Sequence, residues 1–186
     1  MVPEAPLEQT EVGRVAKADG WFVLNAKDAR WHYAEGRPAL CEFEGDLPFS
    51  QLGIYVNVLG PGQPMARYHW EADQEDFLVL SGEGLLIVEG EERPLRAWDF
   101  VHCPPNTNHV IIGAGEGPCV VLAVGAREHQ DGPDWGGYPV DQVALRHGAG
   151  GEQETNDPDD ASADVNPKRE PTRYRDGWRP HRLHGQ

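Results

Sequence analysis

Residues 60–84, GPGQPMARYHWEADQEDFLVLSGEG, form the stretch of the chain that decides its fold. Residues two apart on a β-strand face the same side, so a strand that ends near Glu71 projects His69 and Glu71 together. After a short turn, Glu75 begins a second strand, which leads to Gly82. An imidazole and two carboxylates at one spot of an antiparallel pair provide half of a metal site.

The other half of the metal site is predicted from residues 97–109, AWDFVHCPPNTNH, where a strand and a proline-rich turn lead to His109. Two imidazoles with one or two carboxylates are a mixed nitrogen and oxygen donor set without thiolate, which suits divalent Fe, Mn, Ni, Co or Zn. We therefore expect one divalent transition metal ion held by His69, Glu75 and His109. Glu71 is expected either as a fourth ligand or as a catalytic general base.

These two stretches resemble the motifs of the cupin superfamily. The first motif is Gly, five residues, His-x-His, three or four residues, Glu, six residues, Gly; it is similar to residues 69–82. The second is Gly, five residues, Pro-x-Gly, two residues, His, three residues, Asn; it is similar to residues 98–113, with His109 in place. The resemblance covers about residues 50–126. It implies a single-domain metal-binding protein built as a double-stranded β-helix, or jelly-roll, barrel.

The chain departs from this family pattern at four positions. Glu71 stands where the family usually has its second histidine. Trp98, Asn106 and Gly113 replace the Gly, Gly and Asn of the second motif. The departures leave the role of Glu71 open.

The spacing before His69 also allows a second alignment of this strand. Six residues, not five, separate Gly62 from His69, and a count of five would point Tyr68 and Trp70 inward instead. A slip of one residue turns every side chain to the opposite face, so only one alignment can hold. We prefer the alignment through His69 because only that one supplies donors for a metal.

The rest of the region from Trp21 to about Ala126 consists of short apolar segments between Gly, Pro and acidic turns, which predicts an all-β antiparallel barrel. The expected strands are Trp21–Leu24, Ala39–Phe43, Leu52–Leu59, Met65–Glu71, Asp76–Ser81, Leu85–Glu89, Phe100–Cys103, His109–Ile112 and Cys119–Val124. One short helix is expected at Pro139–His147, with proline at its first position and Gly148 after its end.

The predicted organisation has four parts: a polar lead-in (1–20), the barrel (21–127), a linker with the short helix (128–148) and a charged tail (149–186). The tail is acidic at first and basic afterwards, which is typical of a solvated, mobile segment. Tyr174, Trp178 and Leu183 are nevertheless candidates to anchor it on the barrel or on a neighbouring subunit.

Composition narrows the range of partners. The formal net charge of −15 argues against nucleic acid and anionic membrane surfaces. No apolar run approaches the roughly 20 residues of a membrane-spanning helix, and the first residues lack the pattern of a secretory signal.

Cys41, Cys103 and Cys119 form no CxxC pair, so we expect free thiols and a cytoplasmic location. The resemblance to cupins, together with the apolar segment Trp21–Leu24, leads us to expect a homodimer.

Two classes of function are compatible with these features. The first is a metal-dependent enzyme that acts on a small molecule; the resemblance favours a non-haem dioxygenase over an isomerase or lyase. The second is a non-catalytic module that binds a small ligand or senses a metal. A barrel of this type hosts both classes, so the fold alone does not choose between them.

Overall fold

The computed structural model describes residues 1–130, 132–164 and 167–178. Its strands are β1 (Leu7–Thr10), β2 (Gly13–Ala16), β3 (Arg30–Tyr33), β4 (Ala39–Glu42), β5 (Leu52–Leu59), β6 (Trp70–Glu71), β7 (Glu75–Ser81), β8 (Glu83–Val88), β9 (Glu91–Arg96), β10 (Phe100–Cys103), β11 (His109–Ala114), β12 (Cys119–Ala126), β13 (Gly136–Gly137) and β14 (Glu170–Thr172). Its helices are α1 (Gln142–Arg146) and α2 (Pro158–Ala161).

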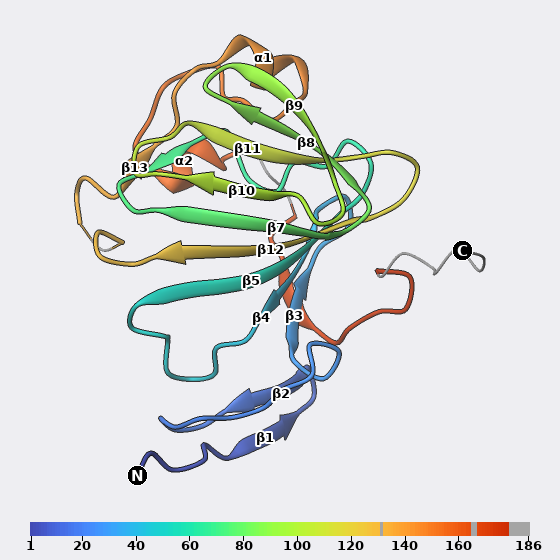
Figure 1. Cartoon of the computed structure of the whole chain (residues 1–186), viewed down its shortest axis with the longest axis vertical. Coiled ribbons are helices and arrows are strands. Elements are labelled where there is room, and N and C mark those ends of the chain that lie inside the picture. The colour runs from blue at the N-terminus through green and yellow to red at the C-terminus, as the bar shows by residue number, and fades with distance from the viewer. Residues whose placement is uncertain (131, 165–166, 179–186) are drawn as a thin grey trace.

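Two antiparallel sheets build the barrel. The larger has seven strands in the order β10-β7-β12-β5-β4-β3-β14, and the smaller has three in the order β11-β8-β9. In Figure 1, the smaller sheet lies next to β10 and β7, which form one end of the larger sheet. The all-β barrel expected from the sequence is confirmed.

Alternation along the strands directs apolar side chains into the barrel. On β7, Phe77 and Val79 are buried while Leu80, next along the strand, is exposed, as expected for residues on opposite faces. The central core cluster takes residues from every strand from β5 to β12 except the short β6. Burial of one such side chain contributes roughly 1.5–3 kcal/mol. Two further buried apolar clusters, one that includes Trp31 and one that includes Tyr68, are separate from this central cluster.

The predicted strands differ in how well they match the structure. Leu52–Leu59 and Phe100–Cys103 appear with the bounds expected. The predicted strand Trp21–Leu24 is wrong, because Trp21 makes only an isolated bridge to Glu4. Of the predicted strand Met65–Glu71, only the last two residues form β6, since the preceding residues contact β11 at separate points and form no continuous ladder.

The structure also contains strands that the sequence pattern missed. The first 20 residues were predicted as a polar lead-in, but β1 and β2 form a hairpin there. β9 is polar and carries Pro94, which suits its place at the edge of the smaller sheet, where a missing N–H donor removes no ladder bond.

The C-terminal segment is bound to the barrel as far as the structure describes it. β14 pairs with β3 at the edge of the larger sheet. The rings of Tyr174 and Trp178 pack on Trp31, with centroids 5.6 and 4.9 Å away. Tyr174 and Trp178 therefore anchor the tail on the barrel, which was one of the two alternatives, while most of the described tail residues are exposed to solvent. Leu183, the third candidate, lies outside the described residues.

Helix α1 is shorter than the predicted Pro139–His147. Asp141 caps its N-terminus, since the Asp141 side chain accepts a hydrogen bond from the Ala144 amide at 2.8 Å. Buried Ala144 packs beside Tyr68 on the outside of the smaller sheet. Tyr68 therefore faces away from the barrel interior.

Two further expectations concern the exterior and the cysteines. No helix in the described ranges is long and apolar enough to cross a membrane. Cys41, Cys103 and Cys119 are free and buried, as expected.

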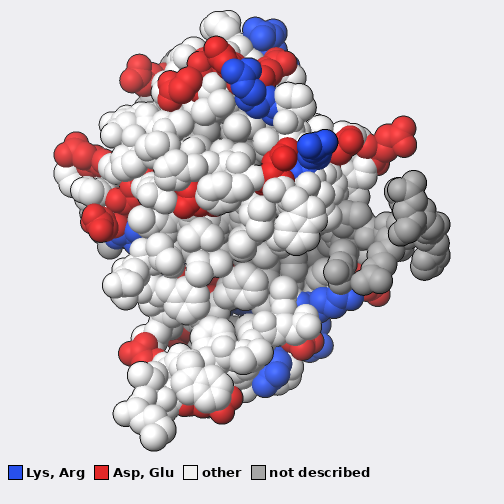
Figure 2. Space-filling model, viewed as in Figure 1, with Lys and Arg blue, Asp and Glu red and all other residues white. Residues whose placement is uncertain are grey.

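Figure 2 shows acidic side chains toward the upper and lower ends of one face, with a largely uncharged middle over β7, β12 and β5.

Candidate metal centre

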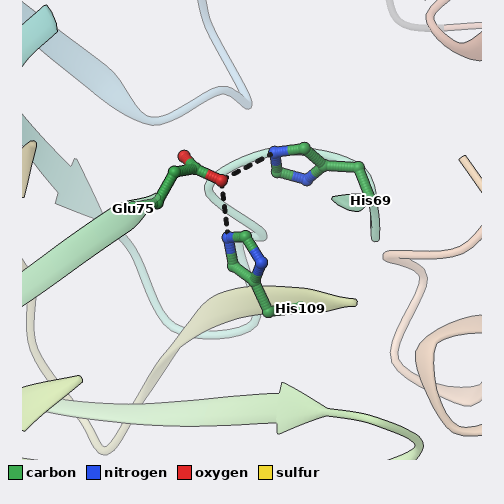
Figure 3. Close-up of side chains that lie close together, drawn as sticks. All are labelled: His69, Glu75 and His109. Carbon is green, nitrogen blue, oxygen red and sulfur yellow. Dashed lines mark ion pairs between the residues drawn. The ribbon is translucent and has the colours of Figure 1, made fainter. Parts of the chain in front are cut away.

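The side chains of His69, Glu75 and His109 point toward one another (Figure 3). Glu75 and His109 are the first residues of β7 and β11. His69 precedes β6 and is joined to His109 by two backbone hydrogen bonds, 3.2 Å from the His69 amide and 2.8 Å from the His109 amide. This bridge sets the two imidazoles side by side, with ring centroids 4.9 Å apart.

The donor atoms of these three side chains converge. Glu75 Oε2 lies 3.3 Å from His109 Nε2 and 3.8 Å from His69 Nε2. The candidate ligand atoms all lie within 4.8 Å of one another, and both histidines are buried. The spacing predicted from the sequence therefore corresponds to a real cluster of two imidazoles and one carboxylate.

Backbone carbonyls orient both imidazoles. His69 Nδ1 lies 2.7 Å from the Arg67 carbonyl oxygen, and His109 Nδ1 lies 3.0 Å from that of Thr107. A carbonyl oxygen only accepts, so each Nδ1 donates a proton to it, and once the ring is neutral each Nε2 has a lone pair for the shared spot. His109 Nε2 is buried and has no hydrogen-bond partner among the described residues. A buried nitrogen that has no hydrogen-bond partner and lies beside a carboxylate is well suited to bind a metal ion.

Comparison with known proteins gives this region a family. The family model described as "Cupin domain" matches residues 55–125. These residues are a cupin domain. The search of curated proteins returned no match.

Comparison with solved structures also found similar proteins. A predicted oxalate decarboxylase from Thermotoga maritima is 19% identical, with 56% of this chain and 98% of that chain covered at a TM-score of 0.50. An uncharacterised double-stranded β-helix protein from Klebsiella pneumoniae is 24% identical, with 50% and 80% covered at a TM-score of 0.44.

A third solved structure has higher sequence identity over a shorter region. It is a putative sugar phosphate isomerase from Acidithiobacillus ferrooxidans, 33% identical, with 41% of this chain and 51% of that chain covered and a TM-score of 0.40. The chain thus spans about half the length of that protein.

Glu71 lies beside the cluster of His69, Glu75 and His109. Its Oε1 lies 3.7 Å from His69 Nε2, yet Glu71 is not part of the group in which all donor atoms are mutually close. The Glu71 side chain is 29% exposed, compared with 15% for Glu75. Glu71 is therefore placed to contact a molecule that enters the site, and the role predicted for it remains a proposal.

Burial and mutual charge control protonation in the cluster. Burial raises the pKa of Glu75 to about 7, and the nearby Glu71 adds to the rise although His69 opposes it. Burial, together with the charge of His69, lowers the pKa of His109 to about 4. Burial alone would lower the pKa of His69, but hydrogen bonding to Glu71 and the charges of Glu75 and Glu71 outweigh it and raise that pKa. Near neutral pH, His109 is thus neutral and able to bind a metal.

A small cavity of about 170 Å³ adjoins the cluster. Glu71 and Glu75 line it together with Tyr55, Arg127 and Trp135. Arg127 is held by a buried ion pair with Glu44 at 2.6 Å. The cavity gives a small molecule a way to approach the carboxylates of the cluster.

Tyr138 is a neighbour of the site that the sequence analysis missed. Its ring stacks on that of His69, with centroids 5.8 Å apart. Burial raises the pKa of Tyr138 to about 12, and the charge of Glu71 adds to the rise, so its hydroxyl keeps its proton. Tyr138 lies outside both motifs, in the predicted linker, and no spacing rule connects it with His69.

A second group of possible metal-binding residues, Asp73, Glu128 and His129, lies outside the barrel interior, with His129 and Glu128 exposed. Asp73 already accepts two hydrogen bonds from His129, 2.8 Å from its amide and 2.6 Å from its Nδ1. These contacts account for the geometry of this group without an ion. His102, the remaining histidine of the second motif region, pairs with Asp76 at 2.7 Å on the outer face of the sheet.

Proposed function

We propose that this chain binds one divalent transition metal ion through His69, Glu75 and His109 and uses it to act on a small molecule. The observation that carries the proposal is the convergence of two Nε2 atoms and a carboxylate, with His109 Nε2 buried and unpaired among the described residues. Burial of such a nitrogen without a partner costs about 1–3 kcal/mol, and coordination would remove that cost.

The donor set indicates the type of metal. Two imidazole nitrogens and a carboxylate suit Fe, Mn, Ni, Co or Zn, and in iron oxygenases two histidines and one carboxylate leave positions open for O₂ and substrate. A bound ion would supply Lewis acidity and, if it is iron, the capacity to react with O₂. We therefore propose an oxidoreductase of the dioxygenase type as the first activity to test.

The residues around the cluster have roles of their own in this proposal. Glu71 lines the 170 Å³ cavity and is placed to accept a proton from a bound molecule. The hydroxyl of the half-buried Tyr138 stays protonated and can donate a hydrogen bond. Trp135 also lines the cavity and offers an aromatic surface to a bound molecule.

The size of the cavity supports an alternative. Ligand pockets usually measure about 300–1,000 Å³, which is more than the space available here. A non-catalytic module that senses the metal or holds a very small ligand needs no larger space. A cupin isomerase or lyase, which requires only proton transfer by a group such as Glu71, is the other alternative. Oxygen consumption separates the dioxygenase from both.

Metal analysis of the purified protein tests the metal site. We expect about one ion per chain, lost in His109→Ala and reduced in His69→Ala and Glu75→Ala. His102→Ala is the matched control, because His102 lies on the outer face, and it should retain the metal. Full metal content in all three site variants would refute the proposed ligands.

Oxygen uptake tests the reaction. Protein loaded anaerobically with Fe(II) is mixed with O₂ and a panel of phenols, thiols and diketones. Uptake that depends on a compound and is lost in His109→Ala supports the dioxygenase. Metal binding without any uptake or turnover would leave the metal site standing and reject the dioxygenase.

A further inference from the structure

A second cavity, of about 370 Å³, gathers three arginines in a chain with a formal net charge of −15. Arg37 comes from the turn between β3 and β4, Arg67 from the segment before His69, and Arg169 from the residue before β14. Arg37 and Arg169 lie outside the matched cupin domain. This cavity is therefore assembled largely by parts that this chain adds to the domain.

Few acceptors compensate these three cations. Arg67 contacts Asp164 at 2.5 Å and the Gly150 carbonyl oxygen at 3.0 Å. The Asp164 side chain is 75% exposed, and an ion pair with such an exposed partner is weak. Arg169 Nε donates to the Pro38 carbonyl oxygen at 2.8 Å. Within the described ranges, neither Arg37 nor Arg169 has a carboxylate partner.

The electrostatics show that the arginines repel one another. Burial lowers the pKa of Arg169 to about 10, and the charge of Arg37 lowers it further. Burial also lowers the pKa of Arg37, and the charge of Arg67 adds to the effect. Arginine nevertheless keeps its proton in proteins, so three positive charges remain in the cavity. An anion placed among them would remove this repulsion.

We propose that this cavity binds a phosphate group, either as inorganic phosphate or as part of a small phosphate monoester. Guanidinium groups match phosphate oxygens with paired N–H donors, and phosphate carries roughly −1.5 to −2 charges near neutral pH. Three arginines with a single exposed carboxylate suit such a dianion better than they suit a monocarboxylate. A volume of 370 Å³ leaves room for a small organic body as well.

The phosphate site adjoins the metal centre without depending on it. Tyr138 lines this cavity, and its ring stacks on His69 at 5.8 Å. A molecule held by its phosphate would thus lie one aromatic ring away from His69. None of the three arginines belongs to the metal cluster, so phosphate binding is expected whether or not a metal is present.

Isothermal titration of the full-length protein with inorganic phosphate, and separately with glycerol phosphate, tests the site. Arg37→Gln and Arg169→Gln should each weaken binding by roughly tenfold or more, because a charged hydrogen-bond partner is lost. Asp164→Asn should strengthen binding, since it removes a competing carboxylate. Arg93→Gln is the matched control, because Arg93 is exposed and pairs with Glu91, and it should bind as the unmodified protein does.

The two ligands and a metal-site variant separate the possible outcomes. Tighter binding of glycerol phosphate than of inorganic phosphate identifies a monoester site, and the reverse identifies a site for free phosphate. His109→Ala should leave phosphate affinity unchanged; its loss there would place the phosphate on the metal instead and overturn the proposal. No binding of either compound, or equal binding in Arg37→Gln, Arg169→Gln and the control, would also overturn it.

Discussion

Replacement of Glu75 by glutamine should stabilise the metal-free protein while it removes the capacity to bind metal. The pKa of Glu75 is raised from 4.5 to about 7, chiefly by burial. Each pKa unit corresponds to about 1.4 kcal/mol, so ionised Glu75 destabilises the fold by roughly 3 kcal/mol above neutral pH. Glutamine has a similar shape and never ionises, so it avoids this cost.

The direction of the effect follows because the pKa of Glu75 is higher in the folded state than in the unfolded state. Glu75 favours the folded state only while it is protonated. Its contribution is fully present below about pH 4.5 and is lost as the pH rises through about 7. The advantage of Glu75→Gln should therefore grow from roughly 1 kcal/mol near pH 5.5 to roughly 3 kcal/mol near pH 8.5.

Urea unfolding with a chelator present, followed at several pH values, measures this difference. Glu116→Gln, in an exposed turn, is the matched control and should change stability little at any pH. A variant Glu75→Gln that is no more stable than the unmodified protein near pH 8.5 would contradict the reasoning. A gain that does not depend on pH would contradict it equally, since ionisation would then not be the cause.

Four further predictions concern the metal, the backbone and assembly. Metal occupancy at limiting metal should fall as the pH drops through about 7, because Glu75 and His69 must release protons to bind; constant occupancy down to pH 5.5 would contradict this. Glu71→Gln should weaken metal affinity about 10–100-fold if Glu71 supports the ion, as a competition titration would show. Trp98→Gly should raise the free energy of unfolding by about 0.5–1 kcal/mol, because Trp98 is 78% exposed and holds φ at 76°, a strained value for any residue with a Cβ. We expect a homodimer in solution, and light scattering that gives the mass of one chain at micromolar concentration would exclude it.

The barrel and the side-chain cluster of His69, Glu75 and His109 could be predicted because both depend on local patterns. Period-two alternation gave the bounds of β5 and β10, and strand geometry placed His69 and Glu71 on one side. Trp98 and Asn106 stand where the cupin motif has glycine, and the structure shows why glycine suits those positions. Both residues have positive φ, 76° and 67°.

The missed features depend on contacts between distant segments. β9 is polar and β1 is short, so neither carries the apolar alternation that marks a half-buried strand. The place where the tail is anchored could not be predicted, because Trp178 packs on Trp31, almost 150 residues earlier, and such contacts leave no local signal. The three-arginine cavity was missed for the same reason, since its residues come from three separate parts of the chain.

A crystal structure of the metal-loaded protein, with anomalous diffraction recorded at the absorption edge of the bound metal, tests the central claim most directly. We predict one strong anomalous peak per chain, between His69 Nε2, His109 Nε2 and the Glu75 carboxylate. The same measurement on His109→Ala should show the peak lost. A peak only beside Asp73 and His129, or no peak at the barrel site with metal in excess, would contradict the account.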